Sequence, residues 1–180
     1  MKDINEINGL KRLLSIFVKD AKKIVIMGIG NYFRSDDAAG LKTIELLEKK
    51  LQKTKMLDDF VTILNCETSP ESFLGKLENL SPSHVILIDA VQMNSCPGSI
   101  GLFGKNDIFD FITTSTHNIS PKLLFTYIEE IVGAKVVIIG IQPKNLNFGR
   151  SISSEIYNAA NIISDILVEV IKNAKITKNY

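Results

Sequence analysis

The sequence lacks several patterns that mark specialised classes of protein. Its 180 residues include only two cysteines, Cys66 and Cys96, and these do not form a Cys-x-x-Cys pair, so we expect a reduced protein without a disulfide framework. No basic segment is followed by an apolar leader, and no apolar run is long enough to cross a membrane. These absences predict a cytoplasmic protein with no membrane insertion.

An excess of charge of one sign is also lacking. The chain carries 21 basic and 20 acidic residues, scattered along its length, for a formal net charge of +1. This balance argues against binding to nucleic acid or to a membrane surface. With 45% hydrophobic residues and no repeat, low-complexity tract or Pro/Gly-rich linker, the chain is long enough for one well-buried domain. We therefore expect a single-domain monomer that selects its partners by shape and chemistry.

Apolar, β-branched runs alternate along the chain with segments of helical period. This alternation is typical of an α/β domain in which a mostly parallel, twisted sheet has helices on both faces. The five expected strands are Ile24–Gly28, Val61–Asn65, His84–Asp89, Ser99–Phe103 and Lys135–Gly140. The expected helices are Ile4–Lys19, Asp37–Lys53, Glu71–Leu80, Pro121–Val132 and Ser153–Lys172. We therefore expect a helical extension at residues 1–22, the main domain at 23–172 and a frayed tail at 173–180. The connection Gly104–Asn118 is expected to hold a short helix at Asp107–Ile112 and to serve as a lid or recognition surface.

The segment Gly28-Ile-Gly-Asn-Tyr-Phe-Arg-Ser-Asp-Asp-Ala-Ala-Gly40 places two carboxylates where a strand gives way to a helix. Asp37 lies one turn before Leu41, so it shares the face that packs on the sheet. Asp36 is expected to complement the helix dipole. A dinucleotide fingerprint would need a third glycine where the chain has Phe33, and no Gly-Lys-Ser/Thr follows. We therefore expect no nucleotide or organic cofactor.

Two further polar residues lie at the expected carboxyl edge of the sheet, one at the end of a strand and one ahead of a helix. Asp89 ends an otherwise apolar strand, and His117 comes shortly before the helix start at Pro121. Because ligands of an open parallel sheet bind outside the carboxyl ends of its strands, Asp37, Asp89 and His117 predict a divalent metal site. Taken singly, Asp89 is equally well interpreted as a loop cap, and a histidine in the position of His117 is more often a capping or surface residue than a ligand. A Cys–His nucleophile pair is an alternative, but buried cysteines are usually packing residues.

Four ordered motifs carry a resemblance to a known family. They are Gly28-x-Gly-Asn-x-Phe-x-x-Asp-Asp-x-x-Gly40, Ile88-Asp89-Ala90, Thr116-His117-Asn118 and Gly140-Ile-Gln-Pro143. In this order and spacing they resemble the hydrogenase maturation proteases, in particular the HycI-like endopeptidases, over residues 23–170. The chain departs from the family pattern at Ala38, which is commonly glycine, and at Phe33, which is usually leucine.

The resemblance implies an endopeptidase that removes the C-terminal extension of a [NiFe] hydrogenase large-subunit precursor after nickel insertion. The residues that match the family's metal-contacting and catalytic positions are Asp37, Asp89 and His117, and the nickel is implied to come with the substrate. Substrate contacts are expected at Gly28, Gly30, Asn31 and Gln142. The metal would polarise the scissile carbonyl or activate water, or else an aspartate would act as general base and the metal would serve recognition alone.

Two other classes of function stay open from the sequence alone. The sequence shows no clear nucleophile paired with a base, so the same edge of the sheet could belong to a non-catalytic chaperone that binds nickel or the precursor. A small-molecule hydrolase on the same type of sheet is the third hypothesis.

Overall fold

The apolar runs of the sequence form a five-stranded sheet in the order β2-β1-β3-β5-β4. The computed structural model describes residues 4–53, 59–105, 107 and 120–178. The strands are β1 (Ile24–Ile29), β2 (Val61–Glu67), β3 (His84–Ala90), β4 (Ile100–Phe103) and β5 (Lys135–Ile141). Strands β1, β2, β3 and β5 are parallel, and β4 pairs with β5 in the antiparallel sense. The prediction of a mostly parallel sheet is therefore confirmed.

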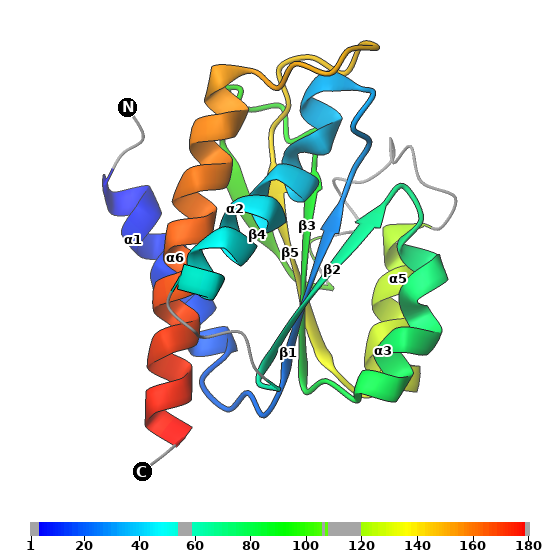
Figure 1. The fold of residues 1–180 in the computed structure, drawn as a ribbon, viewed down its shortest axis with the longest axis vertical. Helices are drawn as coiled ribbons and strands as arrows, with labels where there is room; N and C mark the ends of the chain where they lie inside the picture. The colour runs from blue at the N-terminus through cyan, green and yellow to red at the C-terminus, as the bar shows by residue number, and fades with distance from the viewer. Residues whose placement is uncertain (1–3, 54–58, 106, 108–119, 179–180) are drawn as a thin grey trace.

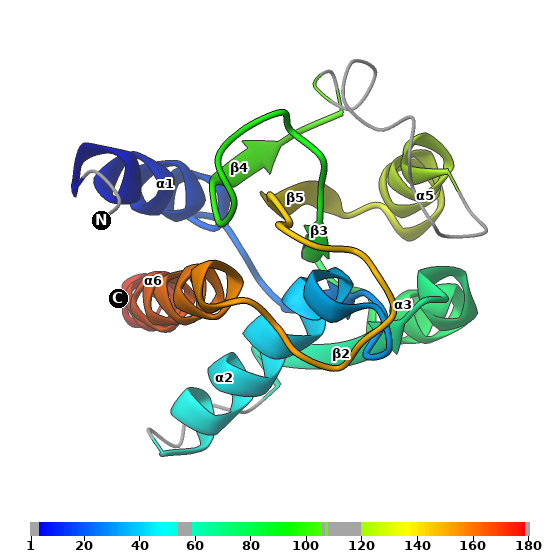
Figure 2. The same cartoon turned by 90° about the horizontal axis from the view of Figure 1, so that it is seen from above.

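Helices cover both faces of this sheet, as predicted (Figure 2). They are α1 (Ile4–Phe17), η1 (Ser35–Ala38), α2 (Ala39–Lys53), η2 (Pro70–Phe73), α3 (Leu74–Leu80), α5 (Pro121–Tyr127), η3 (Ile128–Val132) and α6 (Ser154–Lys178). Helices α1, α2 and α6 lie on one face, and α3 and α5 lie on the other (Figures 1 and 2). None of the helices within the described ranges has the length and apolarity to cross a membrane.

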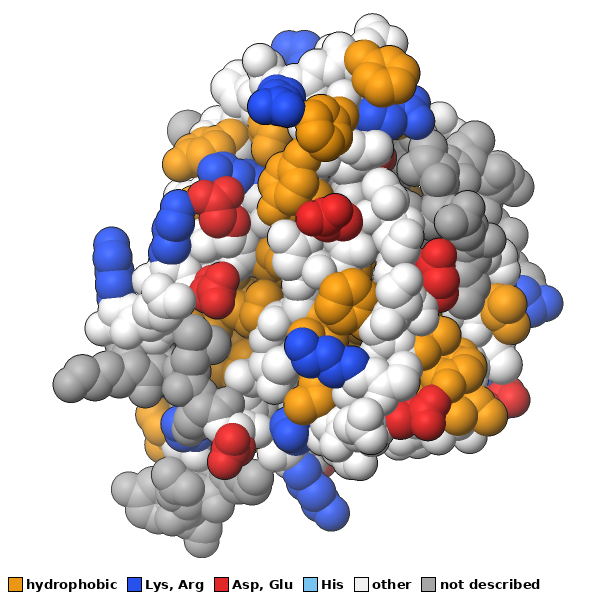
Figure 3. All heavy atoms as spheres, turned by 45° about the vertical axis from the view of Figure 1, so that its right-hand side comes forward, with side chains coloured by type: hydrophobic (Ala, Val, Ile, Leu, Met, Phe, Trp, Pro, Cys, Tyr) orange, Lys and Arg blue, Asp and Glu red, His pale blue; other side chains and the backbone are white. Residues whose placement is uncertain are grey.

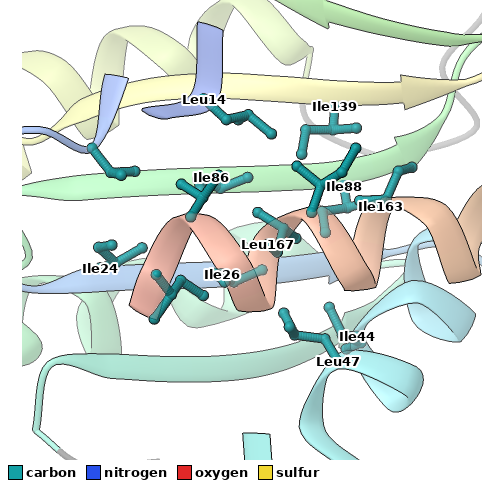
Figure 4. Packing of buried hydrophobic residues seen from close by; sticks show 14 of the residues in the cluster. Leu14, Ile24, Ile26, Ile44, Leu47, Ile86, Ile88, Ile139, Ile163 and Leu167 are labelled. Atoms are coloured by element: carbon teal, nitrogen blue, oxygen red, sulfur yellow. The ribbon is translucent and has the colours of Figure 1, made fainter. Parts of the chain in front are cut away.

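The two faces of the sheet bury alternate residues of the same strands. Ile24, Ile26, Ile86 and Ile88 point toward α2 and α6 (Figure 4), whereas their neighbours along β1 and β3, such as Val25, point to the cluster that includes α3 and α5. Because successive side chains of a strand alternate between faces, only a sheet covered on both sides makes a continuous apolar run favourable.

The helix that precedes the sheet packs on it, together with α6. Leu10, Leu14 and Val18 are buried in the same cluster as the strands and α6, and Lys11 forms an ion pair of 2.5 Å with Glu169 of α6. The N-terminal extension is thus part of the core of this domain. Burial of three such aliphatic side chains stabilises the fold by several kcal/mol, at about 1.5–3 kcal/mol for each one that is fully buried.

Several boundaries differ from the sequence prediction. Residues 35–38 form a 3₁₀ turn, so α2 begins only at Ala39, after Asp37. The segment after α5 widens into the π-turn η3 before Gly133 ends it in a left-handed conformation. Helix α6 continues to Lys178 and includes most of the segment predicted as a tail. Val170 and Ile171 are the last fully buried residues among its described side chains, and the partly buried Ala174, within the segment predicted as a tail, still packs against the same cluster.

Candidate functional site

The candidate site lies where β1 and β3 end side by side. Within the sheet, β2 is the neighbour of β1 on one side and β3 is its neighbour on the other, so the direction in which strands are added reverses at β1. Such a reversal of strand order is the switch point at which open parallel sheets bind their ligands. We call the edge formed by the ends of β1, β2, β3 and β5 the carboxyl rim; it faces upward in Figure 1.

Asp37 is held at this rim by close contact between backbones. A Cβ atom at Gly40 would lie 2.1 Å from the carbonyl oxygen of Ile88, so the start of α2 rests against the end of β3. Gly30, with φ of +148°, approaches η1 in the same way, and a Cβ atom there would lie 2.0 Å from the carbonyl oxygen of Asp37. Contacts this close admit only glycine. They leave the side chain of Asp37 buried, with 5% of its surface exposed.

The glycines therefore make room for the chain itself. The sequence pattern assigned Gly28 and Gly30 to the substrate, but a Cβ atom at Gly28 would lie 2.6 Å from Ile44 of α2. Asn31 is used locally: its Oδ1 accepts a hydrogen bond of 2.9 Å from the backbone N–H of Phe33. Contact of these residues with a substrate stays a prediction.

Asp89 lies at the end of β3, on the strand next to β1. Its side chain is half-buried, and Oδ1 accepts a hydrogen bond of 2.8 Å from the N–H of Ala90. In the sheet it is paired with Gly140 of β5, and β3 contacts η1, the turn that carries Asp37. The structure thus brings Asp37 and Asp89 to the same rim, as the sequence predicted.

His117 lies outside the described residues, as does most of the connection Gly104–Asn118. Its approach to the two aspartates stays a prediction. The segment that follows it is described: the hydroxyl of Ser120 caps α5 by accepting a hydrogen bond of 3.3 Å from Leu123 N–H. Helix α5 begins at the end of the sheet where β1 and β3 finish (Figure 1).

The prediction that Asp36 serves its own helix was wrong. Its side chain is fully buried and holds the loop between β5 and α6. Its carboxylate accepts hydrogen bonds from the backbone N–H groups of Lys144 (3.0 Å), Asn145 (2.9 Å) and Ser153 (2.7 Å), and another from the Ser153 hydroxyl (3.1 Å). All four donors are more than 100 residues away in the sequence, so no local pattern could have indicated them.

Gln142 braces a second loop at the rim. Its buried side-chain oxygen accepts hydrogen bonds from the N–H groups of Met93 (2.6 Å) and Ser95 (3.3 Å). Its side-chain nitrogen donates to the Gln92 side chain and to the Pro143 carbonyl oxygen. These four bonds use the full capacity of a primary amide. The structure gives Gln142 a positioning role, and a direct contact with substrate stays a prediction.

Two carboxylates at a switch point can bind a metal ion or act as acid and base. No cluster of three or more His, Cys, Asp or Glu side chains with metal-binding geometry occurs within the described ranges, which exclude His117. Cys66 is an unsuitable nucleophile, because burial raises the pKa of its thiol to about 12. Of the predicted metal-contacting and catalytic residues, the described part of the rim therefore holds the carboxylates of Asp37 and Asp89.

Comparisons with known proteins agree with this arrangement. The family model described as hydrogenase maturation protease (HycI) matches residues 42–170. A protein of Methanocaldococcus jannaschii named as a hydrogenase maturation protease is 30% identical over 174 residues, which cover 94% of this chain and 100% of that protein. The hydrogenase 3 maturation protease of Escherichia coli K12 is 27% identical over 139 residues, 77% of this chain and 85% of that one. The crystal structure of HycI from Thermococcus kodakarensis KOD1 aligns with a TM-score of 0.78 at 30% identity, covering 89% of this chain and 99% of that chain.

Proposed function

Because the chain belongs to the hydrogenase maturation protease family, we propose that it removes the C-terminal extension of a [NiFe] hydrogenase large-subunit precursor after nickel insertion. Membership makes it an endopeptidase that processes a hydrogenase precursor. The site of the cut, the dependence on nickel and the roles of individual residues are the parts that we propose.

One observation carries the proposal for the site. Asp37 and Asp89 are 52 positions apart in the sequence, yet the contact between η1 and β3 brings their segments to one switch point. A nickel ion carried by the precursor would be contacted by these two carboxylates, and imidazole from His117 would suit it as a further ligand.

In this mechanism the protein's residues orient the substrate and handle protons. Asp37 and Asp89 would contact the substrate's nickel and hold the adjoining peptide bond at the rim. The metal would then stabilise charge that develops on the scissile carbonyl, or one aspartate would take a proton from the attacking water. The precursor would thus be cut only when its nickel is in place. Both cysteines are free thiols in the structure, which is compatible with action in the cytoplasm, where we place it.

The test is incubation of the purified protein with the nickel-loaded precursor and, separately, with the nickel-free precursor. A shortened precursor in the first reaction alone supports the proposal, and a stable complex with an unchanged precursor identifies a chaperone instead. Turnover of a small amide or ester with no effect on the precursor would identify a small-molecule hydrolase.

Variants then assign the residues. Asp37→Asn, Asp89→Asn and His117→Ala should each abolish cleavage while the protein stays folded. Asp165→Asn is the matched control, since its carboxylate lies on the exposed side of α6 and pairs with Lys50; it should leave cleavage unchanged. Full activity of the Asp37→Asn/His117→Ala double variant would refute the assignment.

A further inference from the structure

Three aromatic side chains are exposed on two loops at the carboxyl rim. Tyr32 and Phe33, which precede η1, are 43% and 55% exposed, and Phe148, in the loop between β5 and α6, is 89% exposed. Hydrophobic side chains gather along the upper part of this face of the molecule (Figure 3). We call Tyr32, Phe33 and Phe148, together with Arg150, the aromatic surface. Neighbouring exposed aromatics of this kind mark interaction sites more often than single exposed apolar residues do.

The aromatic surface is fixed in place by its own contacts. The N–H of Gly149 donates a hydrogen bond of 2.9 Å to the carbonyl oxygen of Phe33, which joins the two loops. The Arg150 guanidinium lies 4.7 Å from the centre of the Phe33 ring, a cation–π contact. The Tyr32 hydroxyl accepts a hydrogen bond of 3.1 Å from the Asn65 side chain. The rings of Tyr32 and Phe33, held in this way, lose little entropy when a partner binds.

Position and composition point to the occupant. Tyr32 and Phe33 lie on a loop whose ends are joined by a hydrogen bond of 3.3 Å from the Asn31 N–H to the Asp37 carbonyl oxygen, so the loop that carries these rings is next to Asp37 in space. Lys144 and Arg150 are the only charged residues in the loop from 142 to 153. Aromatic side chains with an arginine are the composition of binding hot spots between proteins. Exposed aromatic rings are stabilised when apolar groups cover them and remove them from water. Apolar side chains of a polypeptide would do this.

We propose that the aromatic surface binds the hydrogenase precursor through apolar residues next to the peptide bond that is cut. This inference rests on the proposed function and adds the recognition surface to it. Affinity then comes from the rings, and the chemistry comes from Asp37 and Asp89.

The first experiment measures binding. Phe33→Ala and Phe148→Ala are made in an Asp37→Asn background, and each protein is titrated with purified nickel-loaded precursor that keeps its extension. Each change should raise the dissociation constant by about tenfold or more, which is the range expected for an interface aromatic. Ile131→Ala is the matched control, because Ile131 is 63% exposed on η3; its dissociation constant should stay within twofold of the background. Unchanged binding by both phenylalanine variants would overturn the proposal.

The second experiment separates this surface from the catalytic assignment. With Asp37 intact, Phe148→Ala should raise KM and leave kcat unchanged, and a fall in kcat at unchanged KM would count against a binding role. If the unmodified protein cuts no precursor, the proposed function fails, and the titrations still decide whether the surface binds the precursor. If the protein is a dimer that Phe148→Ala converts to a monomer, the surface is a contact between copies and the proposal is wrong. Because Phe148 is almost fully exposed, its replacement should leave the melting temperature unchanged.

Discussion

Replacing Asp36 should destabilise the protein more than replacing any exposed carboxylate. The Asp36→Ala change removes the acceptor of three backbone N–H groups and one hydroxyl. Lys144 and Asn145 are exposed residues, so water would reach part of the vacated site and lower the cost. At about 1 kcal/mol for each lost backbone bond, we expect a loss of about 3 kcal/mol in the free energy of unfolding. For a protein of this size that corresponds to a drop of about 6–12 °C in melting temperature.

Asp36→Asn refines this prediction. An asparagine keeps one oxygen, but its amide group must face at least one of the backbone donors, so one bond is lost and two donors oppose each other. The expected cost is about 1–2 kcal/mol, between wild type and alanine. Urea denaturation measures both values, provided that the dependence of the unfolding free energy on urea concentration (the m value) is unchanged. Asp165→Ala on α6 is the control. A loss for Asp36→Ala no larger than that of the control would refute the reasoning.

The same substitution has a functional consequence. Asp36 fixes the loop that carries Phe148 and Arg150 to the turn that carries Asp37. Asp36→Ala should therefore speed amide hydrogen exchange at Asn145 and Ser153 and weaken binding of the precursor. Faster exchange throughout the sheet, without a local effect, would indicate general destabilisation instead.

Three further predictions concern other buried features. Gly30→Ala should strongly destabilise the fold and abolish cleavage, because its φ is +148° and a Cβ atom would lie 2.0 Å from a backbone oxygen of η1. Gly9→Ala should instead stabilise helix α1 by about 0.5–1 kcal/mol, because nothing lies within 4 Å of the added Cβ atom. Thermal unfolding of the two variants compares these effects. Burial lowers the pKa of His84 below its ordinary value of 6.5, although a neighbouring carboxylate offsets part of the shift. The unfolded chain therefore binds the proton more readily, so stability is complete above pH 6.5 and declines as the pH falls below it; denaturation at about pH 7.5 and about pH 5.5 should show a smaller decline for His84→Gln. At about pH 8, iodoacetamide should modify the exposed Cys96 and spare Cys66, whose pKa is about 12; mass spectrometry of the native protein that showed Cys66 modified first would contradict this.

Much of the fold follows from local patterns. The apolar runs at β1 and β3 are long enough, and rich enough in β-branched residues, to predict buried parallel strands. The spacing of Leu41, Ile44 and Leu47 predicts the buried side of α2. Element ends were less accurate, as at η1 and α6, because a terminus depends on which side chains find partners elsewhere in the fold.

In the candidate site, too, some residues were indicated by local patterns and others depend on contacts between distant segments. Asp89 was predicted as a site residue because it is the one charge at the end of an otherwise apolar strand, and Asp37 because its spacing before Leu41 predicts an inward-facing position. Their roles in the site stay predictions. The role of Asp36 was missed, although it is the neighbour of Asp37 and the more buried of the two. Its donors come from a loop that only the folded chain brings near.

The sequence by itself determined the α/β architecture, the family and the strand ends from which Asp37 and Asp89 arise. These properties depend on periodicity and motif order, which are local along the chain. The tertiary structure alone decided that the glycines of the first motif accommodate backbone contacts, that Gln142 and Asp36 hold loops, and that Tyr32, Phe33 and Phe148 share one surface. Each of these depends on close contacts between segments far apart in sequence, and hydrogen bonds and packing of that kind have no signature in a single stretch of residues.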